Sequence, residues 1–211
     1  MAVTEHPLND LKHYLPEGSF DKVVEYLHRY QVHLTVSKVR KSVLGDYRHA
    51  HLGSNHRISV NGNLNQYEFL ITLLHELAHL LTYEAYKNRV EAHGKEWKLC
   101  YGILLNDFIL LNIFPKEVEV VLKKSMLSPA ATANGEVALL TVLRKYNQHQ
   151  KEGFQLLSSI PEGALFMTDN GKIFKKGKLR RKRYACVELK TGLPYTVSAI
   201  SEVKQLAVVN H

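Results

Sequence analysis

Apolar positions in the first 150 residues recur mostly at the three- and four-residue spacing of helices. Between two of the helical segments the spacing changes to a partial alternation interrupted by Gly and Asn, which is typical of short strands. The pattern therefore predicts an α+β domain in this part of the chain. Helices are predicted at 19–31, after residue 65, and at 96–111, 115–126 and 135–146, and strands at 32–40, 44–53 and 56–62.

The helix after residue 65 carries the strongest signal. Asn65 can cap its first turn, and Glu68 follows three positions later, as in a capping box. The residues that repeat on one face are all large and apolar, which predicts that this helix lies in the core. They are Phe69, Leu73, Leu77 and Leu80.

The pattern changes after about residue 150. Residues 163–177 hold two apolar stretches around Asp-Asn-Gly, and residues 182–200 hold two more around Thr-Gly. Such dipeptides between apolar stretches are hairpin signals. The uncharged, turn-forming segment 127–135 is the best internal linker. We therefore expect a small β-rich module to follow the α+β domain.

The charge is unevenly distributed. The chain of 211 residues has a net charge of +8, and residues 151–211 contain eleven basic and five acidic residues. Residues 172–183 contain eight Lys or Arg and no acid. A concentrated basic surface attracts polyanions, nucleic acid first among them. The plainer alternative, a solvated face that keeps the protein soluble, is equally compatible with charge alone.

Several protein classes are disfavoured by composition. No apolar run approaches the roughly 20 residues that span a bilayer, and residues 1–20 lack the pattern of a signal peptide. Only two cysteines occur, Cys100 and Cys186, so neither a disulfide framework nor a four-cysteine zinc site is expected. We expect a cytoplasmic protein.

The segment HELAHLLTYEAYKNRVEAHGKEW, residues 75–97, predicts a metal site. His75 and His79 are four residues apart on the predicted helix, so both imidazoles can reach one ion. Glu76 is rotated from His75 by about 100° and is free to act on a water molecule. In a chain with twelve histidines an accidental match is possible. However, three polar residues on an otherwise apolar helix need a purpose, because burying them without partners is costly.

A catalytic zinc site needs a third protein ligand and one open position. His93 is favoured because Gly94 permits a tight entry into the next helix, and Trp97 can pack behind the imidazole. Glu91 remains the main alternative. The acidic candidates in this region are Glu84, Glu91 and Glu96. Glu84 is on the same helix as His75 and His79, on a side that faces away from them.

The arrangement H-E-x-x-H, thirteen residues, then H-G-x-x-W resembles the SprT-like (Spartan) zinc metalloproteases. The resemblance implies a zincin-like metalloprotease domain over residues 1–128. It also implies one zinc ion per chain, held by His75, His79 and His93, with Glu76 as the general base. The better-known members of this family cleave proteins trapped on DNA.

The resemblance is weaker beyond that domain. SprT-like proteins often end in a four-cysteine zinc ribbon, and of such cysteines only Cys186 stands here. We expect a linker and helix at 129–150, then a basic β-hairpin module at 151–211 that resembles a zinc ribbon without its cysteines. Tyr184, beside the basic run, could stack on a base or equally pack within the hairpin.

Taken together, these patterns predict a zinc-dependent endopeptidase that acts on protein substrates and is recruited to DNA or to DNA-bound proteins. The alternative is a nucleic-acid-binding or regulatory protein with a vestigial metalloprotease fold. The strand at 56–62 is expected to hold extended substrate by edge pairing. The DNA contacts are expected from Lys178, Arg180, Arg181 and Arg183. His49, His51 and His56 could line the cleft or assist the oxyanion, although such histidines are more often polar surface residues. Tyr83 and Tyr86 could donate to a tetrahedral intermediate, although tyrosines at a helix end usually pack.

Overall fold

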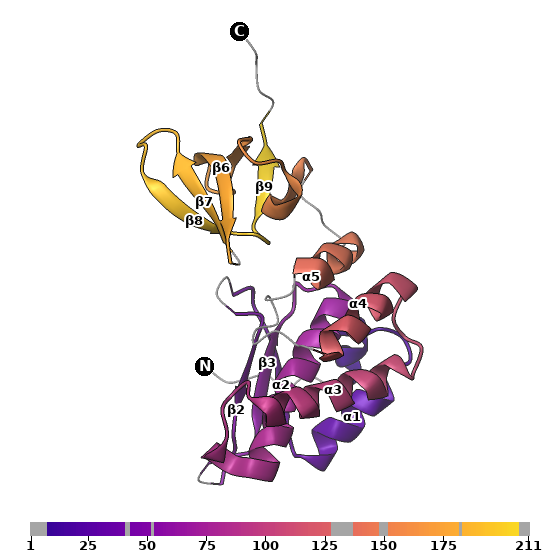
Figure 1. Ribbon diagram of the computed structural model, residues 1–211. Coiled ribbons are helices and arrows are strands. Elements are labelled where there is room, and N and C mark those ends of the chain that lie inside the picture. Colours follow the sequence, from indigo (N-terminus) through magenta and orange to yellow (C-terminus); the bar gives the residue numbers. More distant parts are fainter. Residues whose placement is uncertain are drawn as a thin grey trace. The chain divides into compact units, whose positions relative to one another are not determined.

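The computed structural model describes residues 8–40, 43–51, 53–127, 137–147, 152–181 and 183–206. The chain divides into two compact units, residues 1–147 and 148–211 (Figure 1). Both helices and sheets are present, so the mixed α+β class expected from the sequence is confirmed. The linker predicted at 127–135 lies, apart from its first residue, outside the described residues.

The first unit contains a three-stranded sheet of β1 (His33–Ser37), β2 (Gly45–Arg48) and β3 (Arg57–Asn61). The strand order is β1-β3-β2, with β1 parallel and β2 antiparallel to β3. The prediction that the strand at 56–62 is a free edge is therefore wrong, because β3 is paired on both sides. The open edges of this sheet belong to β1 and β2.

Helices make up most of the rest of this unit, and α2 is central among them. It packs against β2 and β3 of the sheet and against α3, so almost every side of it is buried. The helices are η1 (Leu8–Tyr14), α1 (Phe20–Arg29), α2 (Gln66–Tyr86), η2 (Lys87–Arg89), α3 (Lys95–Ile109), α4 (Lys116–Leu127), α5 (Val137–Leu143) and η3 (Arg144–Tyr146).

The start of α2 follows the sequence prediction. The Asn65 side-chain oxygen accepts a hydrogen bond from the Glu68 backbone N–H at 3.0 Å and so satisfies a donor that the first turn leaves unpaired. The four apolar residues predicted to share one face are all fully buried. Leucines on the other sides of α2 are also buried, which fits a helix enclosed by a sheet and a second helix.

The segment 137–147 belongs to the first unit, although the sequence placed it between two domains. Leu139 and Leu143 of α5 are buried in the core of the first unit. Asn65, whose oxygen caps α2, also donates through its side-chain nitrogen to the Leu143 carbonyl oxygen at 3.0 Å and to Asn147 Oδ1 at 2.7 Å. One buried amide thus connects the start of α2 to the end of α5.

The second unit is an antiparallel sheet with strand order β4-β9-β5-β6-β7-β8. Both predicted hairpins are present, with β5 paired to β6 and β7 paired to β8. A separate core, which includes Phe166, Phe174 and Cys186, lies within this unit. The likeness to a zinc ribbon stays a prediction. The elements are β4 (Phe154–Leu156), η4 (Leu157–Ser159), β5 (Leu165–Met167), β6 (Ile173–Arg180), β7 (Arg183–Glu188), β8 (Pro194–Ser198) and β9 (Glu202–Gln205).

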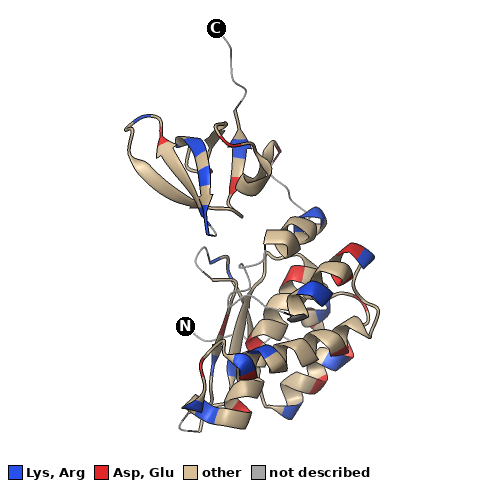
Figure 2. Ribbon diagram, in the orientation of Figure 1, with Lys and Arg blue, Asp and Glu red and all other residues tan. Residues whose placement is uncertain are grey.

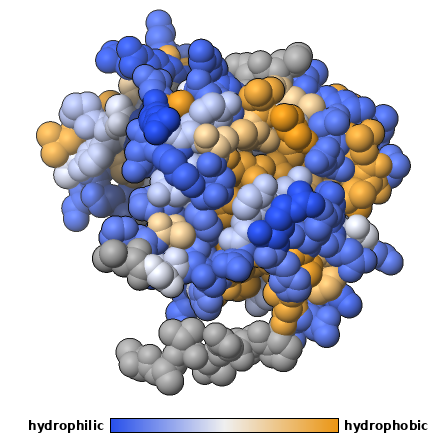
Figure 3. Space-filling view, turned by 90° about the horizontal axis from the view of Figure 1, so that it is seen from below, coloured by the Kyte–Doolittle hydropathy of each residue, from blue (hydrophilic) through white to orange (hydrophobic). Residues whose placement is uncertain are grey.

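Some apolar surface remains exposed. Leu99 and Ile103 on α3, and Leu110 just after it, are more than half exposed, and apolar areas interrupt the polar surface in the view of Figure 3. Within the described part of the chain, no helix is both long enough and apolar enough to cross a membrane.

Candidate metal centre

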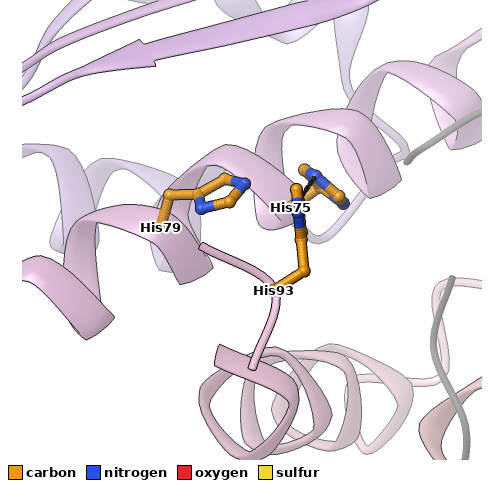
Figure 4. Close-up of side chains that lie close together, drawn as sticks. All are labelled: His75, His79 and His93. Atoms are coloured by element: carbon orange, nitrogen blue, oxygen red, sulfur yellow. Dashed lines mark hydrogen bonds between the residues drawn. The ribbon is translucent and has the colours of Figure 1, made fainter. Parts of the chain in front are cut away.

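Three histidines meet at the side of α2 that faces α3 (Figure 4). His75 and His79 come from successive turns of α2, and His93 comes from the segment that leads into α3. One ring nitrogen from each histidine lies within 4.8 Å of the other two. Among the described residues this is the only group of His, Cys, Asp and Glu side chains with such a geometry.

The closest pair of nitrogens has the spacing of two zinc ligands. His75 Nε2 and His93 Nε2 are 3.4 Å apart. Two nitrogens bound at about 2.0–2.1 Å to one tetrahedral zinc ion lie about 3.3–3.4 Å apart. Two imidazole lone pairs this close repel each other unless a proton or a cation lies between them. The three histidines can therefore hold a metal ion, and three protein ligands leave one position open.

The electrostatics of the site favour metal over protons. Burial, and then the neighbouring histidines, lower the pKa of His75 to about 3. Burial and His93 lower the pKa of His79 to about 4, and burial lowers the pKa of His93. The imidazoles are therefore neutral at pH 7, which is the form that binds a metal.

Trp97, the only tryptophan of the chain, lies behind the histidines. Its ring centroid is 4.7 Å from that of His75, 5.4 Å from His79 and 4.8 Å from His93. It is fully buried, and its indole N–H has no hydrogen-bond partner within the described structure. An unpaired buried donor costs about 1–3 kcal/mol, so this ring is placed for its packing against the imidazoles.

Glu76 is buried and faces the sheet, as its rotation from His75 requires. A Cβ atom at Gly45 of β2 would lie 2.6 Å from Glu76 Oε1, which shows how closely the strand approaches this carboxylate. Burial, reinforced by Asp46 and opposed by Arg40, raises the pKa of Glu76 to about 8. A carboxyl group with a pKa near neutrality is suited to take up and release a proton at pH 7.

The acidic alternatives to His93 lie outside this group. Glu91 is exposed. Glu84 contacts His56 Nε2 at 3.3 Å and Lys87 Nζ at 3.0 Å, and Glu96 lies 3.8 Å from a lysine. The structure therefore brings together the three histidines and none of the rival carboxylates.

The remaining histidines and tyrosines of this region form a cluster at the end of β2. The His49 ring stacks on Tyr83 at 4.5 Å, and the Lys87 ammonium lies 4.9 Å from the centre of the same ring. His56 is buried, whereas His51 is exposed. Tyr86 is exposed at the last turn of α2. A hollow of about 570 Å³ near this cluster is lined by residues that include His51, His56 and Glu84 but none of the metal-binding group.

Two residues beside the site had no signal in the sequence. Gly45 meets Glu76, and Tyr47 lies parallel to His79 with ring centroids 6.5 Å apart. Both come from β2. Only their alternation along a strand could have indicated that they share a face, and nothing in the sequence indicates that this face covers α2.

The four residues predicted to contact DNA lie on β6, on β7 and between them, and the basic positions of the second unit are blue in Figure 2. Lys178, Arg180 and Arg181 are exposed, and no side-chain hydrogen bond or ion pair between described residues involves them. Arg183 donates to the Thr196 side-chain and backbone oxygens, at 3.2 and 2.8 Å. Three of the four residues predicted to contact DNA therefore have guanidinium or ammonium groups available to a ligand.

Of the two roles expected for Tyr184, the structure shows packing within the unit. The Lys176 ammonium lies 3.8 Å from the centre of its ring and is buried, with hydrogen bonds to the carbonyl oxygens of Leu157 and Ile160. One face of the ring is thus covered from within the unit. Tyr184 is a packing residue here, and a base could stack only on its other face.

Comparison with known proteins agrees with the site. Residues 11–108 match the model of the SprT-like family, a range that includes β1 to β3, α2 and all three histidines. No curated protein and no solved structure matches the chain. The matched segment coincides with the elements that build the metal centre, and the match supports assignment of residues 11–108 to the SprT-like family.

Proposed function

We propose that this protein is a zinc-dependent endopeptidase with a zincin-like domain that acts on protein substrates. The observation that carries the proposal is the 3.4 Å separation of His75 Nε2 and His93 Nε2, with His79 beside them and a buried carboxylate on the same helix. Three neutral imidazoles suit zinc, and a three-ligand site with an open position is the arrangement of catalytic rather than structural zinc. We infer one zinc ion per chain.

Zinc held by His75, His79 and His93 would supply Lewis acidity for a peptide carbonyl and for a water molecule, whose pKa it would lower towards 7. Glu76 takes the proton from the attacking water and passes it to the leaving amine. Burial raises the pKa of this carboxyl group above its ordinary value, which favours its acceptance of a proton from water. The close contact with Gly45 fixes the carboxylate on the sheet side of the helix.

The free edge of β2 is suited to hold the substrate. Asn61 N–H donates to the Leu44 carbonyl oxygen at 2.9 Å. Bonded and non-bonded pairs alternate in an antiparallel ladder, so Asp46 is the next residue of β2 that bonds to β3. Gly45 and Tyr47 then direct their N–H and C=O groups away from β3, where an extended peptide can pair with them. This role passes from β3, to which the sequence assigned it, to β2.

Replacing Glu76 by Gln tests the reaction. The variant should bind zinc like the parent, because Glu76 is not a ligand, and should lose cleavage of an unfolded protein such as reduced casein by at least about 100-fold, within the range for a general base. A chelator should abolish the activity of the parent. A Gln variant as active as the parent, both inhibited by the chelator, would remove Glu76 from the mechanism.

We further propose that the second unit brings the enzyme to DNA or to DNA-bound proteins. The supporting observation is that Lys178, Arg180 and Arg181 are exposed and that their side chains form no hydrogen bond or ion pair with other described residues, so their charge is available to phosphates. The competing function is nucleic-acid binding or regulation on a vestigial protease fold. In that case DNA binding would persist in a protein that holds no zinc or cleaves nothing.

A further inference from the structure

The orientation of His79 is not fixed by a hydrogen bond between described residues. Histidines that bind metals usually donate their second ring N–H to a carboxylate or a carbonyl, which sets the rotation of the ring. Within the described structure, neither ring nitrogen of His79 takes part in a hydrogen bond. Some other feature must therefore set its rotation.

Aromatic rings contact His79 and can set the rotation of its imidazole. Trp97 lies 5.4 Å from His79 at an angle of 35°. Tyr47 of β2 lies 6.5 Å away with its plane only 3° from that of the imidazole. Both distances fall within the range of interacting rings, about 4.5–7 Å. His79 is thus contacted by one ring from α3 and one from the sheet.

Tyr47 is itself held at its hydroxyl group. The hydroxyl oxygen lies 3.0 Å from His56 Nδ1, and the two rings are 5.9 Å apart and nearly parallel. The Ala50 backbone N–H also donates to His56 Nδ1, at 3.3 Å. Because Nδ1 accepts from the backbone, it carries no proton, and the Tyr47 hydroxyl is the donor in their hydrogen bond. The Tyr47 ring is therefore fixed in rotation and in distance from α2.

The other ring nitrogen of His56 faces α2, the helix that carries His75 and His79. With Nδ1 unprotonated, the proton of the neutral ring is on Nε2, which lies 3.3 Å from Glu84 Oε1. Burial lowers the pKa of His56 and so favours this neutral form. Glu84 is on α2, five residues after His79. The chain Tyr47–His56–Glu84 therefore connects the sheet to the same helix that presents His79.

We propose that Tyr47 is a positioning residue that holds His79 in its metal-binding orientation, and that His56, fixed by Glu84, holds Tyr47. The inference rests on the metal site proposed above, and it goes beyond the ligands and the general base. The Tyr47 side chain contacts neither substrate nor metal in this role. It acts through the imidazole that it faces, while its backbone lies at the open edge of β2.

Cobalt(II) binding tests the inference apart from catalysis, because the visible absorption of cobalt reports ligand geometry. Tyr47→Ala should weaken cobalt affinity by about 10–100-fold, as is usual when the support of a ligand is removed, and should alter the absorption bands. Tyr47→Phe keeps the ring and should lose less. His56→Ala should weaken cobalt affinity about as much as Tyr47→Phe. The double variant Tyr47→Phe/His56→Ala should lose no more affinity than either single variant, because the two residues act as one unit.

Tyr86→Ala is the matched control, since Tyr86 is an exposed aromatic residue at the last turn of α2. It should keep the affinity and spectrum of the parent. If Tyr47→Ala does not fold without metal, Tyr47→Leu, which fills similar space without a flat ring, replaces it. Parent-like binding by the Ala or Leu variant, or an equal loss in Tyr86→Ala, would overturn the inference. A parent that binds cobalt but cleaves nothing refutes the protease function and leaves this inference standing, whereas a parent that binds no cobalt refutes both.

Discussion

Gly45 of β2 lies so close to Glu76 of α2 that no side chain fits at position 45. A Cβ atom there would lie 2.6 Å from Glu76 Oε1, 2.8 Å from Glu76 Cγ and 2.9 Å from Thr72 Cγ2. Real Cβ atoms do not approach heavy atoms this closely, so glycine is required for the strand to lie against the helix here. The strand at the open edge of the sheet and the proposed general base are thereby held in one fixed relationship.

Gly45→Ala should therefore displace either Glu76 or β2. We expect a loss of stability of about 1–3 kcal/mol, as is usual for overpacking, and a larger relative loss of peptidase activity than of zinc content. Thermal unfolding, metal analysis and cleavage rate per bound zinc measure the three effects. Gly102→Ala is the control, because its Cβ would meet nothing closer than 3.9 Å and alanine favours the helix. Equal activity of both variants would show that the contact does not matter for the reaction.

Substitution can decide whether the third zinc ligand is His93 or Glu91. His93→Ala should lower zinc content sharply, because two histidines hold zinc far more weakly than three, whereas Glu91→Ala should leave zinc content unchanged. Metal analysis after dialysis decides between them. The fluorescence of Trp97, the only tryptophan, gives an independent reading, since its ring packs against all three histidines. Loss of zinc on Glu91→Ala with retention on His93→Ala would reverse the ligand assignment.

Stability of the metal-free protein should depend on pH through Glu76. Its folded-state pKa of about 8 lies above its ordinary value of 4.5, so the unfolded chain loses this proton first, and stability falls as pH rises from about 4.5 to 8. Metal-free Glu76→Gln should therefore be more stable than the parent at pH 8, by on the order of 3 kcal/mol.

The difference should be small at pH 5 and vanish below about pH 4.5, where Glu76 is protonated in the folded and the unfolded chain. Chemical unfolding of parent and variant at pH 5 and pH 8, both with chelator, measures it. Glu91→Gln is the control, because Glu91 is exposed and should change stability little at either pH. A Gln variant that is equally stable with the parent at pH 8 would contradict the burial argument.

DNA binding by the second unit should depend strongly on salt. Each phosphate contact steepens the log–log slope by about 0.9 on duplex and about 0.7 on single strands. The variant in which Lys178, Arg180, Arg181 and Arg183 become Ser should have a flatter slope, by up to about 3 on duplex, and weaker binding to all sequences. Titration of both strand forms at two salt concentrations measures it.

A control variant of equal charge replaces four lysines of the first unit by Ser, and its slope should stay that of the parent. An equal, weak response of the parent to DNA, heparin and polyglutamate would instead mark a solvated basic face. No binding of the parent at low salt would end the DNA proposal. The residues changed in the control are Lys95, Lys98, Lys116 and Lys124.

Features that depend on neighbours in sequence were predictable. The cap of α2 at Asn65 needs only the residue three positions later, and His75 and His79 share a face because of helix geometry alone. The β5–β6 and β7–β8 hairpins follow from turn residues between apolar stretches. His93 was favoured over Glu91 for a local reason too, the glycine that follows it.

The order of strands in the first sheet could not be predicted in this way, because it depends on contacts between distant segments. The strand at 56–62 looked like a substrate-binding edge, yet β1 and β2 cover both of its sides. Likewise, the helical segment at 137–147 resembled part of a linker, and only the buried side chains of Leu139 and Leu143 and the bonds from Asn65 assign it to the first unit.

The sequence by itself indicated the three histidines, the carboxylate beside them and the likeness of residues 11–108 to the SprT-like family, because these are periodicities and spacings along one chain segment. Only the tertiary structure decided that Gly45 and Tyr47 complete the site. Both residues are ordinary in a short strand, and they acquire a role only where β2 lies along α2. Close packing between segments that are thirty residues apart is set by the whole core, which no local pattern encodes.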